Sequence, residues 1–225
     1  MFKKISILTA GFLLSVSVFA SDVQDLIQNA ENGDVVAQAN LADYYHNQQD
    51  YINEFYWTEK LANQGFATSQ FNLGVMYNNG LGVHQDDAKA VEWHTKSASQ
   101  NFVLAQFHLG NMYRNGRGVE KDDNKAIEWW SKSAQQDFEK AQYNLAGMYL
   151  RGESVEKDLN KAFELYQKSA LQGNPKAQFN LASMYANGDG VAKNRIKAKE
   201  WFSKSCKNSK QDACEQYEIL ESQGY

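Results

Sequence analysis

Proline is almost absent from this chain of 225 residues, because Pro175 is the single one. Cysteine is scarce as well, and Cys206 and Cys214 are the two present. Gln, Asn, Ala and Lys are abundant instead, which favours helices joined by short glycine turns over a β-sandwich or barrel. With 43% hydrophobic and 22% charged residues, the composition is that of a folded protein. It predicts an all-α fold.

Positive charge is in deficit, with 23 Lys and Arg against 27 Asp and Glu. Lys3 and Lys4 precede an apolar run that closes with small residues at Ala20, which is the layout of a signal peptide. We predict cleavage after Ala20; the alternative is a membrane anchor, for which the run is short. Removing residues 1–20 takes away two lysines and no acid, so 21 basic and 27 acidic residues give a charge of −6. A nucleic-acid partner is not expected, since no basic stripe can neutralise phosphates.

The chain contains a repeat with a period of 36 residues. The predicted signal peptide, 1–20, precedes a repeat domain at 21–225, and the expected units are about 29–62, 63–98, 99–134, 135–170 and 171–206, with a capping helix at 207–225. The residues that step by 36 include Leu73, Leu109, Leu145 and Leu181, and Tyr77, Tyr113, Tyr149 and Tyr185. The first copy has lost four residues from its loop, because Tyr45 and Trp57 are 12 apart rather than 16.

Each copy reads as two helices and a turn. In the third copy Leu109 and Tyr113 lie at helical spacing, and residues 115–118 (Asn-Gly-Arg-Gly) tolerate the positive φ that ends a helix. Asp122 or Asp123 can then cap the second helix. One hairpin cannot bury both of its faces, so the copies are predicted to stack into a right-handed superhelical α/α solenoid of about five helix-turn-helix repeats. Ser154 replaces a glycine, so the fourth turn is expected to differ.

The consensus A-Q-x-x-L-G-x-M-Y-x-x-G-x-G-V-x-x-D-x-x-K-A-x-x-W-x-x-K-S-A resembles the sel-one-like repeat (SLR) family, which is related to the tetratricopeptide repeat. The resemblance covers about residues 29–206. It implies a non-enzymatic scaffold that binds proteins or peptides, often in the bacterial envelope, in secretion or in contact with host cells. We therefore expect a periplasmic protein, with secretion as the alternative. We expect no cofactor and no stable membrane insertion after cleavage, and a monomer.

Cys206 and Cys214 lie close together in a chain that is predicted to be exported, so a disulfide is expected, with two free thiols as the alternative. The same Cys-x7-Cys spacing occurs in cysteine-rich bacterial members of the family. The resemblance implies a bridge between adjacent helices that would hold the last helix in place.

No catalytic or metal-binding motif emerges from the sequence. The four histidines show no zinc-binding spacing, and because each stands at a variable repeat position they are expected at the surface; they are His46, His84, His94 and His108. Ser154 and Lys157 match the S-x-x-K of penicillin-interacting enzymes, but the companion S-D-N and K-T-G motifs are missing. Asp86-Asp87 and Asp122-Asp123 are explained by helix capping rather than by a cation. A cell-wall or β-lactam hydrolase and a purely structural envelope subunit are the alternative functions.

The resemblance to tetratricopeptide proteins places the first helix of each unit on a concave groove, where an aromatic ladder beside amide side chains would bind a peptide. Simple packing of the aromatics is the alternative. The predicted groove residues are Phe71, Phe107, Tyr143, Phe179, Asn72, His108, Asn144, Asn180, Asn111, Arg114 and Arg151. Arg114, Arg117, Lys140 and Arg151 could together attract a carboxylate, or could be scattered solvated charges.

Overall fold

The computed structural model describes residues 20–208 and 210–225, so the predicted signal peptide lies outside the described residues apart from Ala20. The described residues form twelve helices and no strand, which confirms the all-α prediction. The helices are α1 (Ala20–Glu31), α2 (Val35–Asn47), α3 (Tyr51–Asn63), α4 (Ala67–Asn79), α5 (Asp87–Ser99), α6 (Val103–Asn115), α7 (Asp123–Gln135), α8 (Glu139–Arg151), α9 (Leu159–Leu171), α10 (Pro175–Asn187), α11 (Arg195–Lys207) and α12 (Gln211–Ser222).

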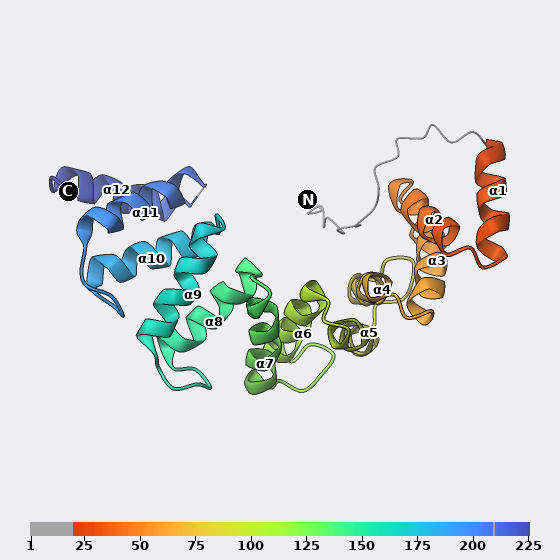
Figure 1. Ribbon diagram of the computed structural model, residues 1–225, viewed down its shortest axis with the longest axis horizontal. Coiled ribbons are helices and arrows are strands. Elements are labelled where there is room, and N and C mark those ends of the chain that lie inside the picture. The colour runs from red at the N-terminus through yellow and green to blue at the C-terminus, as the bar shows by residue number, and fades with distance from the viewer. Residues whose placement is uncertain (1–19, 209) are drawn as a thin grey trace. The chain divides into compact units, whose positions relative to one another are not determined.

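The helices belong to two compact units, one with α1 to α6 and the other with α7 to α12, which divide after Lys121. Within the first unit the α2–α3 and α4–α5 pairs pack as hairpins, and α1 packs on α2. Within the second unit the α8–α9 and α10–α11 pairs do the same, and α12 packs on α11 (Figure 1). The last described helix, α12, lies within the range 207–225 where a capping helix was expected. The helix α1, whose Ala30 is fully buried, was not predicted.

The helix boundaries follow from the capping residues of the repeat. The second helices begin behind a polar side chain that accepts a hydrogen bond from the backbone three residues on, namely Asp50, Asp86, Asp122, Asp158 and Asn194. Asp122 rather than Asp123 is thus the cap of α7. Four of the first helices end at a left-handed glycine: Gly80, Gly116, Gly152 and Gly188.

The first hairpin differs from the later ones both in its loop and in its core. Three residues separate α2 from α3, whereas seven separate α4 from α5, as the Tyr45-to-Trp57 spacing predicts. Glu54 stands where the later hairpins have a buried alanine, such as Ala90, and it is 4% exposed. Both of its carboxylate oxygens lie 3.1 Å from Nδ1 of His46. The first hairpin thus has an acid in its core with a histidine beside it.

A ladder of buried glutamines joins successive hairpins. In each first helix a glutamine Nε2 donates to the carbonyl oxygen eight residues earlier, at the end of the preceding helix, over 2.9–3.4 Å. The side chains are Gln38, Gln70, Gln106, Gln142 and Gln178, all at most 6% exposed. The amide of a later residue, such as Gln100 for Gln70 and Asn208 for Gln178, donates to the glutamine oxygen. Each link satisfies groups that would otherwise be buried without a partner.

At the end of the repeats, a disulfide stands in place of the glutamine-to-carbonyl hydrogen bond. Cys206 and Cys214 are bonded, which confirms the prediction. They stand one repeat after Ala170 and Gln178, the last carbonyl–glutamine pair, with the same separation of eight residues. A covalent bond therefore replaces the hydrogen bond where α12 joins α11.

In three of the four long loops the second glycine packs against the preceding hairpin. A β-carbon at Gly82 would lie 1.8 Å from the carbonyl oxygen of Tyr51, and one at Gly190 would lie 2.2 Å from that of Leu159. Ser154 adopts the same left-handed conformation, with φ 56°, so the expectation of a different fourth turn is wrong. Its hydroxyl donates to Asp123 Oδ2 over 3.2 Å.

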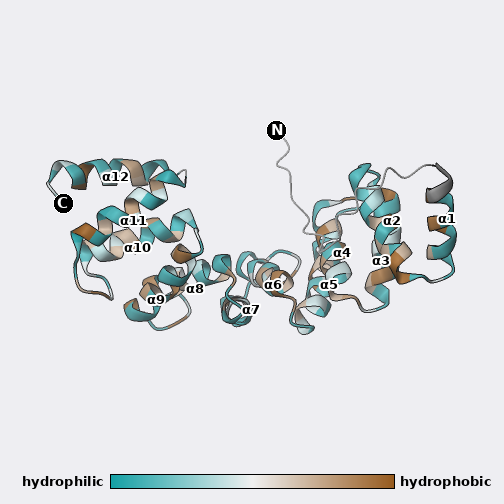
Figure 2. Cartoon of the chain, turned by 45° about the horizontal axis from the view of Figure 1, so that its top comes forward, coloured by the Kyte–Doolittle hydropathy of each residue, from teal (hydrophilic) through white to brown (hydrophobic). Residues whose placement is uncertain are grey.

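Every helix has both hydrophilic and hydrophobic residues along its length (Figure 2). Among the described residues, none of the helices is long and apolar enough to cross a membrane.

Candidate functional site

Predicted groove residues of the second unit converge around the hydroxyl of one buried tyrosine. Tyr166 of α9 is 2% exposed, and its ring lies 5.8 Å from that of Tyr143 on α8. Asn180 on α10 and Arg151 at the end of α8 both act on this hydroxyl, since each lowers the pKa of Tyr166. We call Tyr143, Gly147, Arg151, Tyr166 and Asn180 the α8 site.

The absence of a side chain at Gly147 leaves the space that the guanidinium of Arg151 occupies. Tyr143, Gly147 and Arg151 are each four residues apart, so they follow one another along one side of α8. A β-carbon at position 147 would lie 3.0 Å from Nη1 and 3.4 Å from Nη2 of Arg151. The arginine therefore folds back over the glycine, toward the two tyrosines. It also donates from Nε and Nη2 to Glu153, at 2.5 and 3.3 Å.

The ionisation of these groups follows from that arrangement. Burial raises the pKa of Tyr166 to about 12, while the hydrogen bond from Asn180 and the charge of Arg151 act in the opposite direction. The hydrogen bond to Glu153 raises the pKa of Arg151 above its usual value. At neutral pH the α8 site thus presents the guanidinium cation of Arg151 beside the neutral phenol of Tyr166.

The aromatic ladder packs against the second helices of the hairpins. Tyr143 lies on Tyr166, and the Phe179 ring lies 5.3 Å from that of Phe202. Phe71 is 5% exposed and has His94, Phe102 and His108 within 5.2–5.4 Å. Phe71 is thus a core residue, whereas Phe107, Tyr143 and Phe179 remain partly exposed.

The other predicted groove residues divide between the two units. Asn72, His108, Asn111 and Arg114 of the first unit are partly buried, as are Asn144 and Asn180 of the second. The Oδ1 atom of Asn72 is buried without a hydrogen bond. Asn180 interacts with Tyr166 of the preceding hairpin.

His94 contradicts the expectation that all four histidines lie at the surface. It is 1% exposed and occupies the position that Trp130, Tyr166 and Phe202 fill in the later hairpins. A β-carbon at Gly74 would lie 2.8 Å from its ring. Burial, and then the neighbouring His108, lower the pKa of His94 to about 3. Comparing His94 with the aromatic residues one repeat later would have found this core position from the sequence.

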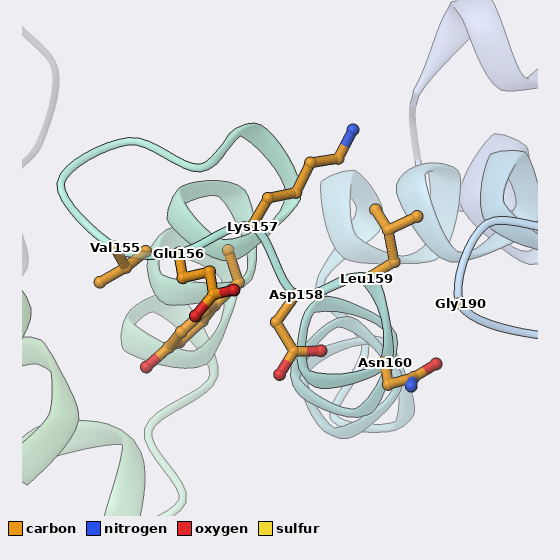
Figure 3. A pocket seen from close by; sticks show the side chains of 8 residues that line it. Val155, Glu156, Lys157, Asp158, Leu159, Asn160 and Gly190 are labelled. Carbon is orange, nitrogen blue, oxygen red and sulfur yellow. The ribbon is translucent and has the colours of Figure 1, made fainter.

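The last three residues of the S-x-x-K segment, 155–157, line a pocket of about 860 Å³ near the loop before α9. Its walls are Tyr149, residues 155–160 and Gly190. The Lys157 side chain extends away from Asp158 and Asn160 (Figure 3), and the Ser154 hydroxyl donates to Asp123 rather than to that lysine. The pocket shares no residue with the predicted groove.

The basic residues that were considered as a carboxylate site have partners of their own. Arg117 donates to Asp87 Oδ2 over 2.9 Å and to the carbonyl oxygen of Asn78 over 2.8 Å, which ties one loop to the preceding hairpin. Lys140 is exposed, and its Nζ lies 5.9 Å from the Phe138 ring. In the described part of the chain no three His, Cys, Asp or Glu side chains form a group that could hold a metal ion.

Repeated hairpins, inter-hairpin glutamines and a polar-aromatic face on the first helices define a helical repeat protein. The Sel1 repeat model matches residues 35–66, 67–102, 103–138, 139–174 and 175–210, so the chain belongs to the Sel1 repeat family, and its fold is that of an SLR solenoid. The matched units begin four to six residues after the predicted ones. Proteins of this family are generally scaffolds for protein–protein interaction.

Solved structures of bacterial SLR proteins have the same fold. The chain is 36% identical to a protective antigen of uropathogenic Escherichia coli, with a TM-score of 0.82, and the match covers 90% of this chain and 44% of that one. It is 30% identical to a Sel1 repeat protein from Oxalobacter formigenes, with a TM-score of 0.79 and coverage of 90% and 60%. The chain thus spans about half the length of these relatives. No curated protein matches it.

Proposed function

We propose that this protein is a non-enzymatic scaffold of the bacterial cell envelope that binds a protein or peptide through the exposed face of its first helices. The membership of the Sel1 repeat family supports the binding role. The disulfide supports a location outside the reducing cytoplasm. The periplasm is the proposed compartment, with secretion as the alternative.

The observation that carries this proposal is the α8–α10 surface of the second unit. Tyr143 and Phe179 are held by packing on Tyr166 and Phe202, yet both rings remain partly exposed. Asn144 and Asn180 follow them directly in the sequence. Rigid aromatic surface next to amide groups suits an extended peptide, whose backbone needs hydrogen-bond partners and whose side chains need apolar contact.

Site-specific photocrosslinking in the native envelope tests this proposal. Benzoylphenylalanine would replace Phe179 in one variant and Ile196, an exposed residue of α11, in the other. Both changes leave an apolar residue, and melting temperatures would verify that both variants fold. We expect a partner protein to be crosslinked, and then identified, from position 179 alone. Crosslinking from position 196 alone, or equally from both, would remove the first-helix face from the proposal.

A further inference from the structure

The α8 site is built from residues that depart from the repeat at neighbouring positions. Arg151 stands where the other first helices carry asparagine: Asn47, Asn79, Asn115 and Asn187. Tyr143 replaces the phenylalanine found in three other copies. Gly147 stands where every other copy has a residue with a side chain. The three changes lie on one side of α8 and meet at the guanidinium.

The fold does not need these departures. Glycine in the middle of a helix destabilises it by roughly 0.5–1 kcal/mol relative to alanine, and the same position is Val75 or Ser183 in other hairpins. The gain from Gly147 is the space that the Arg151 guanidinium occupies. A longer side chain at position 147 would push the guanidinium away from the tyrosines.

The guanidinium already holds a carboxylate in this structure. Glu153 accepts from Nε and Nη2 with one oxygen each, which is the two-point geometry that arginine offers to a carboxylate. Both side chains are open to solvent, with 51% of Arg151 and 37% of Glu153 exposed. An exposed pair of this kind contributes little stability and can exchange partners.

We infer that the α8 site binds a carboxylate group of the peptide partner, which displaces Glu153 from Arg151 while the peptide chain lies along Tyr143. This inference rests on the proposed scaffold function and names the ligand chemistry of one of its sites. Glu153 acts as an internal competitor that occupies the arginine until an acidic ligand arrives. The carboxylate comes from an acidic side chain or from a chain terminus, and the experiment distinguishes these sources.

Three small probes separate the sources: acetyl-Phe-Glu-amide, acetyl-Phe-Gln with a free terminal carboxylate, and acetyl-Phe-Gln-amide. Each would be titrated into the ¹⁵N-labelled full chain while the Arg151 Nε–Hε signal is followed. The variant Arg151→Asn lacks this signal and so identifies it, and it has the asparagine of the other repeats. We expect one or both carboxylate probes to move the signal and the amide to leave it unchanged. In Arg151→Asn, the affinity for the carboxylate probes should be about tenfold weaker, as followed by the backbone amide signals of α8 in the labelled protein.

Two further variants make the result decisive. Glu153→Gln removes the internal competitor, so carboxylate probes should bind up to about fivefold more tightly. Lys168→Gln, which removes one positive charge as Arg151→Asn does but at an exposed position of α9, should leave the affinity unchanged. An Arg151 signal that carboxylates do not move at millimolar concentration, even in Glu153→Gln, would overturn the inference. Crosslinking from position 179 could still succeed in that case, so the scaffold proposal is judged separately.

Discussion

Replacing His94 with phenylalanine should make the protein markedly more resistant to acid. The His94 ring is 1% exposed, its Nδ1 atom has no hydrogen-bond partner, and the one titratable group that shifts it is His108. Its pKa is about 3 in the folded chain and about 6.5 when unfolded. Above pH 6.5 both states are neutral and the shift costs nothing. As the pH falls below 6.5, His94 binds a proton in the unfolded state but not in the folded state, so stability is lost until about pH 3.

The size of the effect follows from the shift. Between pH 8 and pH 5 the loss is about 1.4 kcal/mol per unit below 6.5, or about 2 kcal/mol in total. Phenylalanine does not titrate, and Phe202 fills the same position in the last hairpin. Burial also raises the pKa of Glu54, which favours the folded state as the pH falls. Glu54 is present in both proteins, so its contribution cancels in their comparison.

Urea unfolding followed by circular dichroism at pH 8 and pH 5 measures this difference. The stability gap between His94→Phe and the parent should widen by about 2 kcal/mol at the lower pH. His84→Gln serves as the control, because His84 is exposed and its replacement should leave the parent's acid response in place. An equal gap at both pH values would refute the reasoning that His94 is buried without a proton.

Two further predictions concern the links between hairpins. Reduction of the disulfide should lower the free energy of opening α12, measured by hydrogen exchange, by about 2–3 kcal/mol. The double variant Cys206→Ala with Cys214→Gln should be about 1 kcal/mol more stable than the double serine variant, because it restores the glutamine hydrogen bond. Equal stability of the two variants would contradict the view that the disulfide replaces that hydrogen bond. Gly190→Ala should lower the unfolding free energy by roughly 2 kcal/mol more than Gly173→Ala, because both have positive φ but only Gly190 faces a carbonyl oxygen. Equal losses in urea unfolding would show that the loop moves aside.

Residues that recur every 36 positions could be interpreted correctly from the sequence. These are the leucine and tyrosine spacing, the glycine turns and the presence of an aspartate cap at 122 or 123. They depend on a few neighbouring residues and on helical geometry, so each copy confirmed the others. The prediction at Ser154 failed because a residue other than glycine can adopt positive φ when its surroundings hold it there. His94 was misplaced because a position that varies in residue type can still be buried.

The sequence by itself determined the helices, their hairpin pairing, the shortened first loop and the disulfide, because these follow from local periodicity and from near neighbours. Only the tertiary structure showed that glutamines bridge hairpins and that Phe71 and His94 are core residues. It alone brought Arg151 over Gly147 beside Tyr166. Those facts depend on contacts between residues on different helices, from eight to 30 positions apart, or on which way a long side chain folds, and the spacing of residue types does not contain that information.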